Sequence, residues 1–156
     1  MRGLKDKVII LTGAAGGLGQ ALAKRLTQEK AYPVLVDHNQ SAHLELSQDR
    51  SLNHPLCLSG DIANPDFITT IMAETIEKYG KIDGLVNCAA ILLPDDGDIL
   101  ETPLPCWLKT MEVNLTAVFL TCQAVLPHLE KQGGAIVNLS SVVAHAASAT
   151  SQIAYT

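Results

Sequence analysis

Four glycines within seven residues constrain this chain more than any other feature of its sequence. They are Gly13, Gly16, Gly17 and Gly19. Residues 8–11 before them form a wholly apolar run, typical of a strand that is covered on both faces. After them, leucines recur at helical spacing from Leu18 to Leu26. A strand, a glycine-rich turn and a helix in this order predict a pyrophosphate site, because the backbone can come close and the helix N-terminus offers free N–H groups.

Strand and helix patterns alternate along the rest of the chain. Short apolar runs predict further strands at 33–36, 55–58, 83–88 and 135–139. The helical patterns between them include 65–79, framed by Asn64-Pro65 and Gly80, and one long helix over 104–129. We therefore expect an α/β fold with a Rossmann-like, doubly wound parallel sheet in three α/β/α layers. With 156 residues, the chain has enough material for one domain, 1–156.

Charge and composition exclude several classes of function. The formal net charge of −5, without any run of lysine or arginine, argues against nucleic acid and acidic membranes as partners. No stretch approaches the roughly 20 apolar residues of a membrane span. The four cysteines and five histidines show no metal-ligand spacing, so no metal is expected. Widely separated cysteines are expected to be reduced thiols of a cytoplasmic protein.

An acidic residue stands where a dinucleotide's ribose would lie. Asp37 ends the second predicted strand, 18 positions beyond Gly19. A carboxylate at this place accepts hydrogen bonds from an adenosine ribose and repels a 2′-phosphate, which favours NAD over NADP. A methyltransferase also places glycines after its first strand and an acid after its second. Gly13, Gly16 and Gly19 further satisfy the Gly-x-x-Gly-x-x-Gly pattern of sugar-nucleotide epimerases, so both alternatives stay open.

Taken together, these motifs resemble the short-chain dehydrogenase/reductase family over essentially the whole chain. The family pattern Thr-Gly-x-x-x-Gly-x-Gly begins at Thr12, and the family motif Asn-Asn-Ala-Gly is answered by residues 87–90, at Asn87 and Ala89. The resemblance places Asp61 and Ile62 at the adenine ring. The cofactor-binding residues that we expect are Gly13, Gly17, Leu18, Gly19, Asp37, Asp61, Ile62, Asn87 and Ala89.

The resemblance also implies three catalytic residues. They correspond to Asn114, Ser141 and Tyr155. Asn114 lies within the apolar stripe of the long predicted helix, where a buried amide costs free energy unless it is hydrogen-bonded. Ser141 follows the fifth predicted strand, at the sheet edge where open α/β folds bind ligands. In the family, the tyrosine exchanges the proton with the substrate, the serine positions the substrate oxygen, and the asparagine holds a helix bend and a water relay.

The sequence therefore predicts an oxidoreductase that transfers hydride between NAD(H) and a small secondary alcohol or carbonyl compound. The family has a lysine four residues after its tyrosine, whereas this chain ends at Thr156. We therefore expect the fold to be incomplete at its C-terminus and the 156 residues to have little activity alone. A catalytically incomplete nucleotide-binding fragment is the alternative. The family resemblance also implies pairing along the helix 104–129, so a homodimer or homotetramer is expected when the protein is complete.

Overall fold

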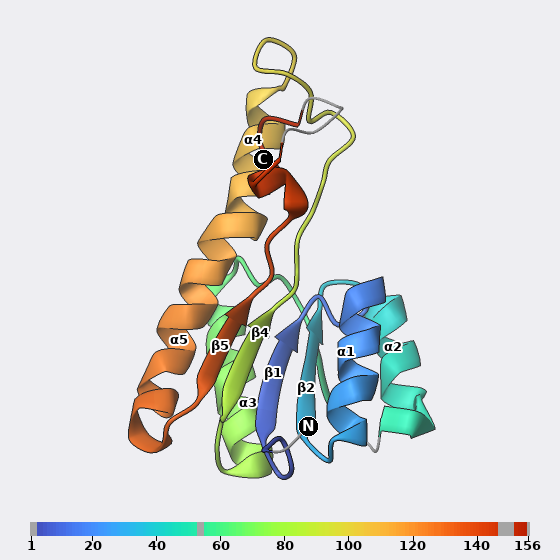
Figure 1. Cartoon of the computed structure of the whole chain (residues 1–156), viewed down its shortest axis with the longest axis vertical. Coiled ribbons are helices and arrows are strands. Elements are labelled where there is room, and N and C mark those ends of the chain that lie inside the picture. Colours follow the sequence, from blue (N-terminus) through green and yellow to red (C-terminus); the bar gives the residue numbers. More distant parts are fainter. Residues whose placement is uncertain (1–2, 53–54, 147–151, 156) are drawn as a thin grey trace.

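Five parallel strands form one sheet in the computed structural model, which describes residues 3–52, 55–146 and 152–155. In chain order they are β1 (Val8–Thr12), β2 (Tyr32–Asp37), β3 (Leu56–Ser59), β4 (Gly84–Asn87) and β5 (Ala135–Asn138). Their order across the sheet is β3-β2-β1-β4-β5 (Figure 1). The direction of winding thus reverses beside β1, as in a doubly wound sheet.

Helices cover both faces of the sheet and make the three predicted layers (Figure 1). One face carries α1 (Gly17–Gln28) and α2 (Gln40–Gln48), and the other carries α3 (Pro65–Tyr79) and α5 (Ala117–Gln132). The remaining helix, α4 (Leu104–Met111), extends beyond the sheet. Short 3₁₀ turns lie at Arg50–Leu52 and Val142–Ala144. The structure confirms the predicted Rossmann-like α/β fold.

Alternating side chains of the strands feed two separate cores. Ile10 and Val36 pack with α3 and α5, whereas Leu11 and Leu35 pack with α1 and α2. All four are buried. Because the central strands are covered on both faces, they read in the sequence as continuous apolar runs rather than as alternating ones.

The ends of α3 follow the sequence signals. The Asn64 side chain accepts a hydrogen bond from the backbone N–H of Asp66 at 2.9 Å, and Pro65 occupies the first helical turn. Gly80 ends the helix with a left-handed φ of 73°. The predicted long helix differs from expectation, because α4 and α5 are joined by a π-helical turn at Glu112–Thr116. No helix in the described ranges is long and apolar enough to cross a membrane.

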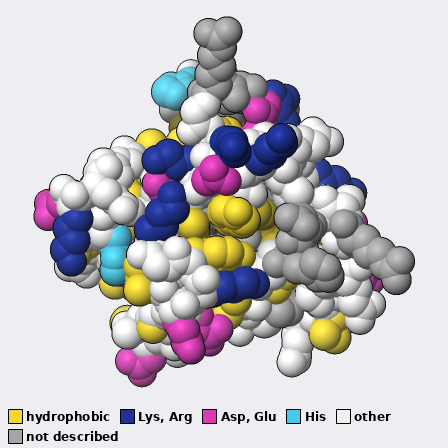
Figure 2. All heavy atoms as spheres, turned by 90° about the horizontal axis from the view of Figure 1, so that it is seen from below, with side chains coloured by type: hydrophobic (Ala, Val, Ile, Leu, Met, Phe, Trp, Pro, Cys, Tyr) yellow, Lys and Arg dark blue, Asp and Glu magenta, His cyan; other side chains and the backbone are white. Residues whose placement is uncertain are grey.

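A charged cluster ties the sheet together at the end from which its strands start. Asp83 accepts hydrogen bonds from the Lys7 Nζ (2.8 Å) and the Val8 N–H (2.9 Å), and the Lys81 Nζ lies 2.9 Å from it. Burial raises the pKa of Asp83, but these hydrogen bonds outweigh burial and hold the pKa below the ordinary 3.8. Figure 2 views this end of the molecule, where charged side chains surround a central group of hydrophobic ones.

Candidate functional site

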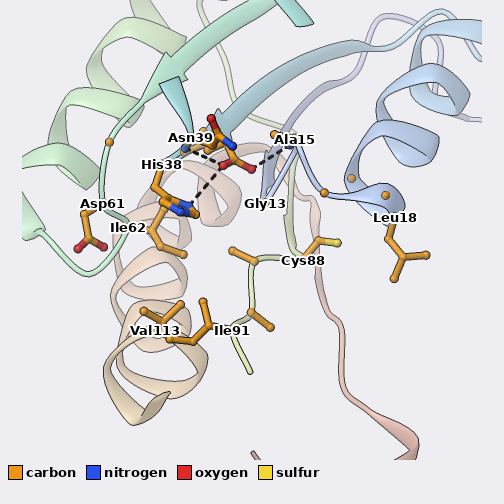
Figure 3. Close-up of a pocket in the computed structure, with 18 of the residues that line it drawn as sticks. Gly13, Ala15, Leu18, His38, Asn39, Asp61, Ile62, Cys88, Ile91 and Val113 are labelled. Carbon is orange, nitrogen blue, oxygen red and sulfur yellow. Dashed lines mark hydrogen bonds and ion pairs between the residues drawn. The ribbon is translucent and has the colours of Figure 1, made fainter. Parts of the chain in front are cut away.

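A cavity of about 870 Å³ opens at the carboxyl ends of β1, β2, β3 and β4 (Figure 3). Four short segments that follow these strands contribute most of its wall, and α4 with the π turn adds the rest. The lining residues are Gly13, Ala15–Gly19, Val36–Asn39, Gly60–Ile62, Cys88–Ile91, Lys109 and Val113. The volume suits a ligand larger than a single small metabolite.

The glycines of the first loop have two different structural roles. A Cβ at Gly13, whose φ is +68°, would lie 2.7 Å from the Ala89 Cα, and a Cβ at Gly19 would collide with the Gly13 carbonyl oxygen. These two glycines allow close packing of the loop. A Cβ at Gly17 would meet nothing within 4 Å, although Gly17 lines the cavity. The backbone at Gly17 therefore leaves open space that a ligand can fill.

The glycine loop enters α1 at the cavity wall. The N-cap is Gly16, which provides no capping side chain. N–H groups of the first helical turn have no acceptor within a helix, so those of Gly17, Leu18 and Gly19 are available to a ligand. Aligned peptide dipoles add about half a positive charge at this end. The arrangement suits an anionic group such as a pyrophosphate.

Asp37 stands beside this loop at the end of β2. Only 8% of it is exposed, and its carboxylate accepts hydrogen bonds from the Ala15 N–H and the Asn39 N–H, both at 2.9 Å. The His38 Nδ1 lies 3.4 Å from Oδ1, the oxygen that accepts from the Asn39 N–H (Figure 3). These contacts fix the carboxylate at the cavity wall.

The cavity wall next to Asp37 carries Asp61 and Ile62, which follow β3, and the Gly60 N–H before them donates to the Asp37 carbonyl at 3.0 Å. Ile62 is buried and packs in the core beneath the wall, whereas Asp61 is exposed. The Lys109 Nζ lies 3.5 Å from Asp61 Oδ2 and donates to Glu112 at 2.8 Å. The hydrogen bond to Glu112 raises the pKa of Lys109, so this ammonium group stays charged. Burial raises the pKa of the Cys88 thiol, which leaves a neutral side chain in the wall.

The predicted residue Asn87 does not line this cavity. It is 4% exposed, accepts a hydrogen bond from the Thr121 hydroxyl and donates one to Asn138 Oδ1, both at 2.9 Å. The structure thus places its side chain as a link between β4, β5 and α5. The eight other predicted cofactor-binding residues all lie in the cavity wall. Next to Asn87, the Thr12 hydroxyl accepts from the N–H groups of Cys88 and Ala89 at 3.2 Å.

Asn114 occupies the middle of the π turn and holds the loop after β4. Its Oδ1 accepts from the Ile91 N–H at 2.8 Å, and its Nδ2 donates to the Ile91 carbonyl at 2.9 Å. Both the oxygen and the nitrogen of the amide are therefore paired with one residue of the cavity wall. This is the hydrogen bonding that a polar side chain in the apolar stripe was expected to need.

Ser141 and Tyr155 lie outside the cavity wall. The Ser141 Oγ accepts from the Val143 N–H at 3.4 Å and caps the 3₁₀ turn Val142–Ala144. The backbone N–H of Tyr155 donates to Asp96 at 2.9 Å. No hydrogen bond joins Asn114, Ser141 and Tyr155 to one another within the part of the chain that the structure describes.

Several residues of the wall were missed by the sequence reasoning. Val113 precedes Asn114 directly and Lys109 lies five positions before it, but both reach the cavity only because α4 and the π turn pack beside the strand ends. His38 and Cys88 each adjoin a predicted residue, so adjacency was the available signal. The described residues contain no group of three His, Cys, Asp or Glu side chains that could hold a metal.

Comparison with known proteins identifies the family. The family model described as short chain dehydrogenase matches residues 7–156, which is nearly all of the chain. The chain belongs to the short-chain dehydrogenase family. This membership excludes the methyltransferase interpretation of the glycines and agrees with the resemblance that the motifs indicated.

Two curated relatives of this chain are named as dehydrogenases. The chain is 33% identical over 137 residues to meso-2,3-butanediol dehydrogenase of Serratia marcescens. This match covers 88% of the chain and 54% of the relative. The chain is 34% identical over 139 residues to NAD-dependent glycerol dehydrogenase of Listeria innocua serovar 6a, with the same two coverages of 88% and 54%. The chain thus spans about half the length of these relatives.

Solved structures agree with the fold of this short-chain dehydrogenase. Levodione reductase superposes with a TM-score of 0.89 at 30% identity, over 97% of this chain and 60% of the other. A short-chain dehydrogenase/reductase from Burkholderia xenovorans gives a TM-score of 0.89 at 31% identity, over 97% and 62%. The comparisons thus show the family and the fold, whereas the activity, the cofactor preference and the substrate require a separate argument.

Proposed function

We propose that the protein is an oxidoreductase that prefers NAD(H) to NADP(H) and interconverts a small secondary alcohol with its carbonyl compound. The observation that carries the preference is the Asp37 carboxylate, held at the cavity wall by the N–H groups of Ala15 and Asn39. A carboxylate at the end of the second strand accepts hydrogen bonds from ribose hydroxyls and repels a 2′-phosphate. No lysine or arginine occurs between Gly13 and Gln20 to compensate that charge.

The shape of the glycine loop supports the fit of a dinucleotide. The missing Cβ of Gly17 leaves space at the cavity wall, next to the first-turn N–H groups of α1. Gly13, Gly17, Leu18 and Gly19 would hold the pyrophosphate, and Asp37 the adenosine ribose. Asp61 and Ile62 would border the adenine, with Ala89 on the far wall. The nicotinamide, when bound, supplies or accepts the hydride.

The chain's own residues would supply the proton transfer and the orientation. In this proposal Tyr155 exchanges the proton with the substrate oxygen, and Ser141 orients that oxygen by a hydrogen bond. Asn114 keeps the π turn and the loop at Ile91 in place through its two hydrogen bonds. Asn87 contributes through the frame, because it links β4 to β5 and α5. A homodimer or homotetramer is the assembly that we propose.

Fluorescence titration with NADH and NADPH tests the cofactor preference. We expect NADH to bind at least about tenfold more tightly, which corresponds to roughly 1.4 kcal/mol. Asp37→Ala should narrow this ratio. Asp66→Ala removes the same charge from an exposed site outside the cavity and should leave the ratio unchanged. Tighter binding of NADPH by the unmodified protein would refute the preference.

Turnover tests the reaction class separately. NADH oxidation should be measured with diacetyl and dihydroxyacetone as carbonyl probes, because relatives are named for butanediol and glycerol. Tyr155→Phe should abolish turnover and leave the Kd for NADH within about twofold. Binding of NADH by the unmodified protein without turnover of any probe would favour the nucleotide-binding alternative.

A further inference from the structure

A buried carboxylate outside the cavity holds the backbone of Tyr155. Asp96 is 6% exposed and lies in the loop between β4 and α4. Its Oδ1 accepts from the Ala154 N–H and its Oδ2 from the Tyr155 N–H, both at 2.9 Å. The neighbouring Gly97 carbonyl accepts from the Ile153 N–H at 3.0 Å. Three successive N–H groups near Tyr155 thus bond to two adjacent residues of one loop.

The buried carboxylate of Asp96 needs these contacts. A buried carboxylate is costly unless hydrogen bonds or a cation compensate it. Among the described residues, no lysine, arginine or histidine forms an ion pair with Asp96. The two N–H groups of Ala154 and Tyr155 are therefore the side chain's compensation, and both carboxylate oxygens are engaged.

The same loop also carries the contact of Asn114. Ile91, five residues before Asp96, pairs with the Asn114 amide through both its N–H and its carbonyl group. The loop is braced internally, because the Gly97 N–H donates to the Thr102 hydroxyl at 3.0 Å and the Asp96 N–H to the Leu93 carbonyl at 3.1 Å. One braced loop therefore holds segments that are far apart in the sequence.

We propose that Asp96 is a positioning residue for Tyr155: its carboxylate sets the backbone, and thereby the phenol, relative to the cofactor and to Asn114. This inference rests on the proposed function, in which Tyr155 carries the proton. Asp96 touches neither the cavity nor the reacting atoms, so its effect is exerted through the Tyr155 backbone.

The test uses the full chain and four variants. Asp96→Ala removes both acceptors. Asp96→Asn keeps one carbonyl oxygen and turns an NH₂ group toward the second N–H, so one of the two bonds is lost. Asp95→Asn is the matched control, because this neighbouring aspartate is exposed and the N–H groups of Ala154 and Tyr155 donate to Asp96 instead. Tyr155→Phe assigns the Tyr155 signal among the three tyrosines.

Two measurements are combined on protein labelled with ¹³C at the tyrosine ζ carbon. The first is hydrogen exchange of the Ala154 and Tyr155 amides. We expect both to exchange at least about tenfold faster in Asp96→Ala, and one of them in Asp96→Asn. The second is the change of the Tyr155 ¹³C signal when NAD⁺ is added. This NAD⁺-induced change should be smaller by at least half in Asp96→Ala than in the unmodified protein, and the reduction should be less in Asp96→Asn. The Kd for NAD⁺ should stay within about twofold of the unmodified value.

Each outcome decides the proposal. Unchanged exchange of both amides in either Asp96 variant overturns it, and so does a full NAD⁺-induced signal change in Asp96→Ala that binds NAD⁺ normally. If Asp96→Ala no longer binds NAD⁺, Asp96→Asn decides by the same criteria. If Asp96→Asn also weakens NAD⁺ binding together with the signal, the role of Asp96 is purely structural and the proposal is overturned. Failure of the unmodified protein to bind NAD⁺ while Asp96 still protects the amides would instead contradict the proposed function.

Discussion

Gly17→Ala should separate the cofactor-binding role of the glycine loop from its structural role. A Cβ at Gly17 meets nothing within 4 Å and Gly17 begins α1, so the protein should tolerate the methyl group. Replacing a helical glycine by alanine typically stabilises by about 0.4–1 kcal/mol when the backbone is compatible. The added methyl group would, however, stand in the space at the cavity wall that we assign to the pyrophosphate.

The expected loss can be sized from the hydrogen bonds at stake. A pyrophosphate displaced from the first-turn N–H groups of α1 forfeits about one charge-assisted hydrogen bond, worth roughly 1.5–3 kcal/mol. The Kd for NADH should therefore rise by about 10- to 150-fold. Fluorescence titration gives the Kd, and urea unfolding gives the free energy of unfolding. We expect weaker binding together with unchanged or higher stability.

Gly13→Ala is the matched control with the opposite expected result. Its φ of +68° and the 2.7 Å approach to the Ala89 Cα leave no room for a Cβ. Left-handed backbone and overpacking together should cost about 2–5 kcal/mol of unfolding free energy. If Gly17→Ala binds NADH as tightly as the unmodified protein, the assignment of this space to the pyrophosphate is wrong. Equal destabilisation by both substitutions would refute the division of roles.

Three further predictions address stability and assembly. Asn114→Ala leaves the N–H and carbonyl groups of Ile91 without their partner and should lower the unfolding free energy by about 2 kcal/mol, measured in urea; an unchanged midpoint would contradict this. The pKa of Asp83 lies below 3.8 in the folded protein, so its stabilising contribution is present above pH 3.8 and lost as the pH falls further. The free energy of unfolding should therefore differ less between pH 7 and pH 3 in Asp83→Asn than in the unmodified protein. An equal difference in both proteins would contradict this role of Asp83. Phe119 and Leu115 are 60% and 63% exposed along the helix that is expected to pair with a second copy. The double variant Phe119→Asp with Leu115→Asp should therefore sediment more as a monomer. A monomeric unmodified protein would contradict pairing along this helix.

Local signals in the sequence located most of the fold. Some backbone conformations are adopted by few residue types, and these mark the glycine loop between β1 and α1. They also mark the two ends of α3, at Asn64-Pro65 and at Gly80. The central strands β1 and β2 were recognisable because both of their faces are buried. Asp37 could be placed because the turn after β2 comes directly after a recognisable strand.

Features that depend on distant contacts could not be predicted in this way. The π turn at Glu112–Thr116 has no sequence pattern of its own and coincides with the pairing of Asn114 and Ile91. Asn87 was expected at the cofactor, but its burial between Thr121 and Asn138 depends on how α5 and β5 pack against β4. Lys109 reaches the cavity for a similar reason. In each case the partner lies more than 20 residues away or on another element.

The strand order has a consequence for the timing of folding. β1 pairs with β2 across a short connection, whereas its other neighbour, β4, arrives only after α3, and contacts such as Val8 to Asp83 and Thr12 to Ala89 span 75 and 77 residues. Closing such long loops costs more chain entropy and is slower than forming the β1–α1–β2 unit. The cavity has walls from both sides of β1, so it is completed late. A ligand bound there should therefore slow unfolding more than it accelerates refolding, because it recognises a surface that the transition state still lacks.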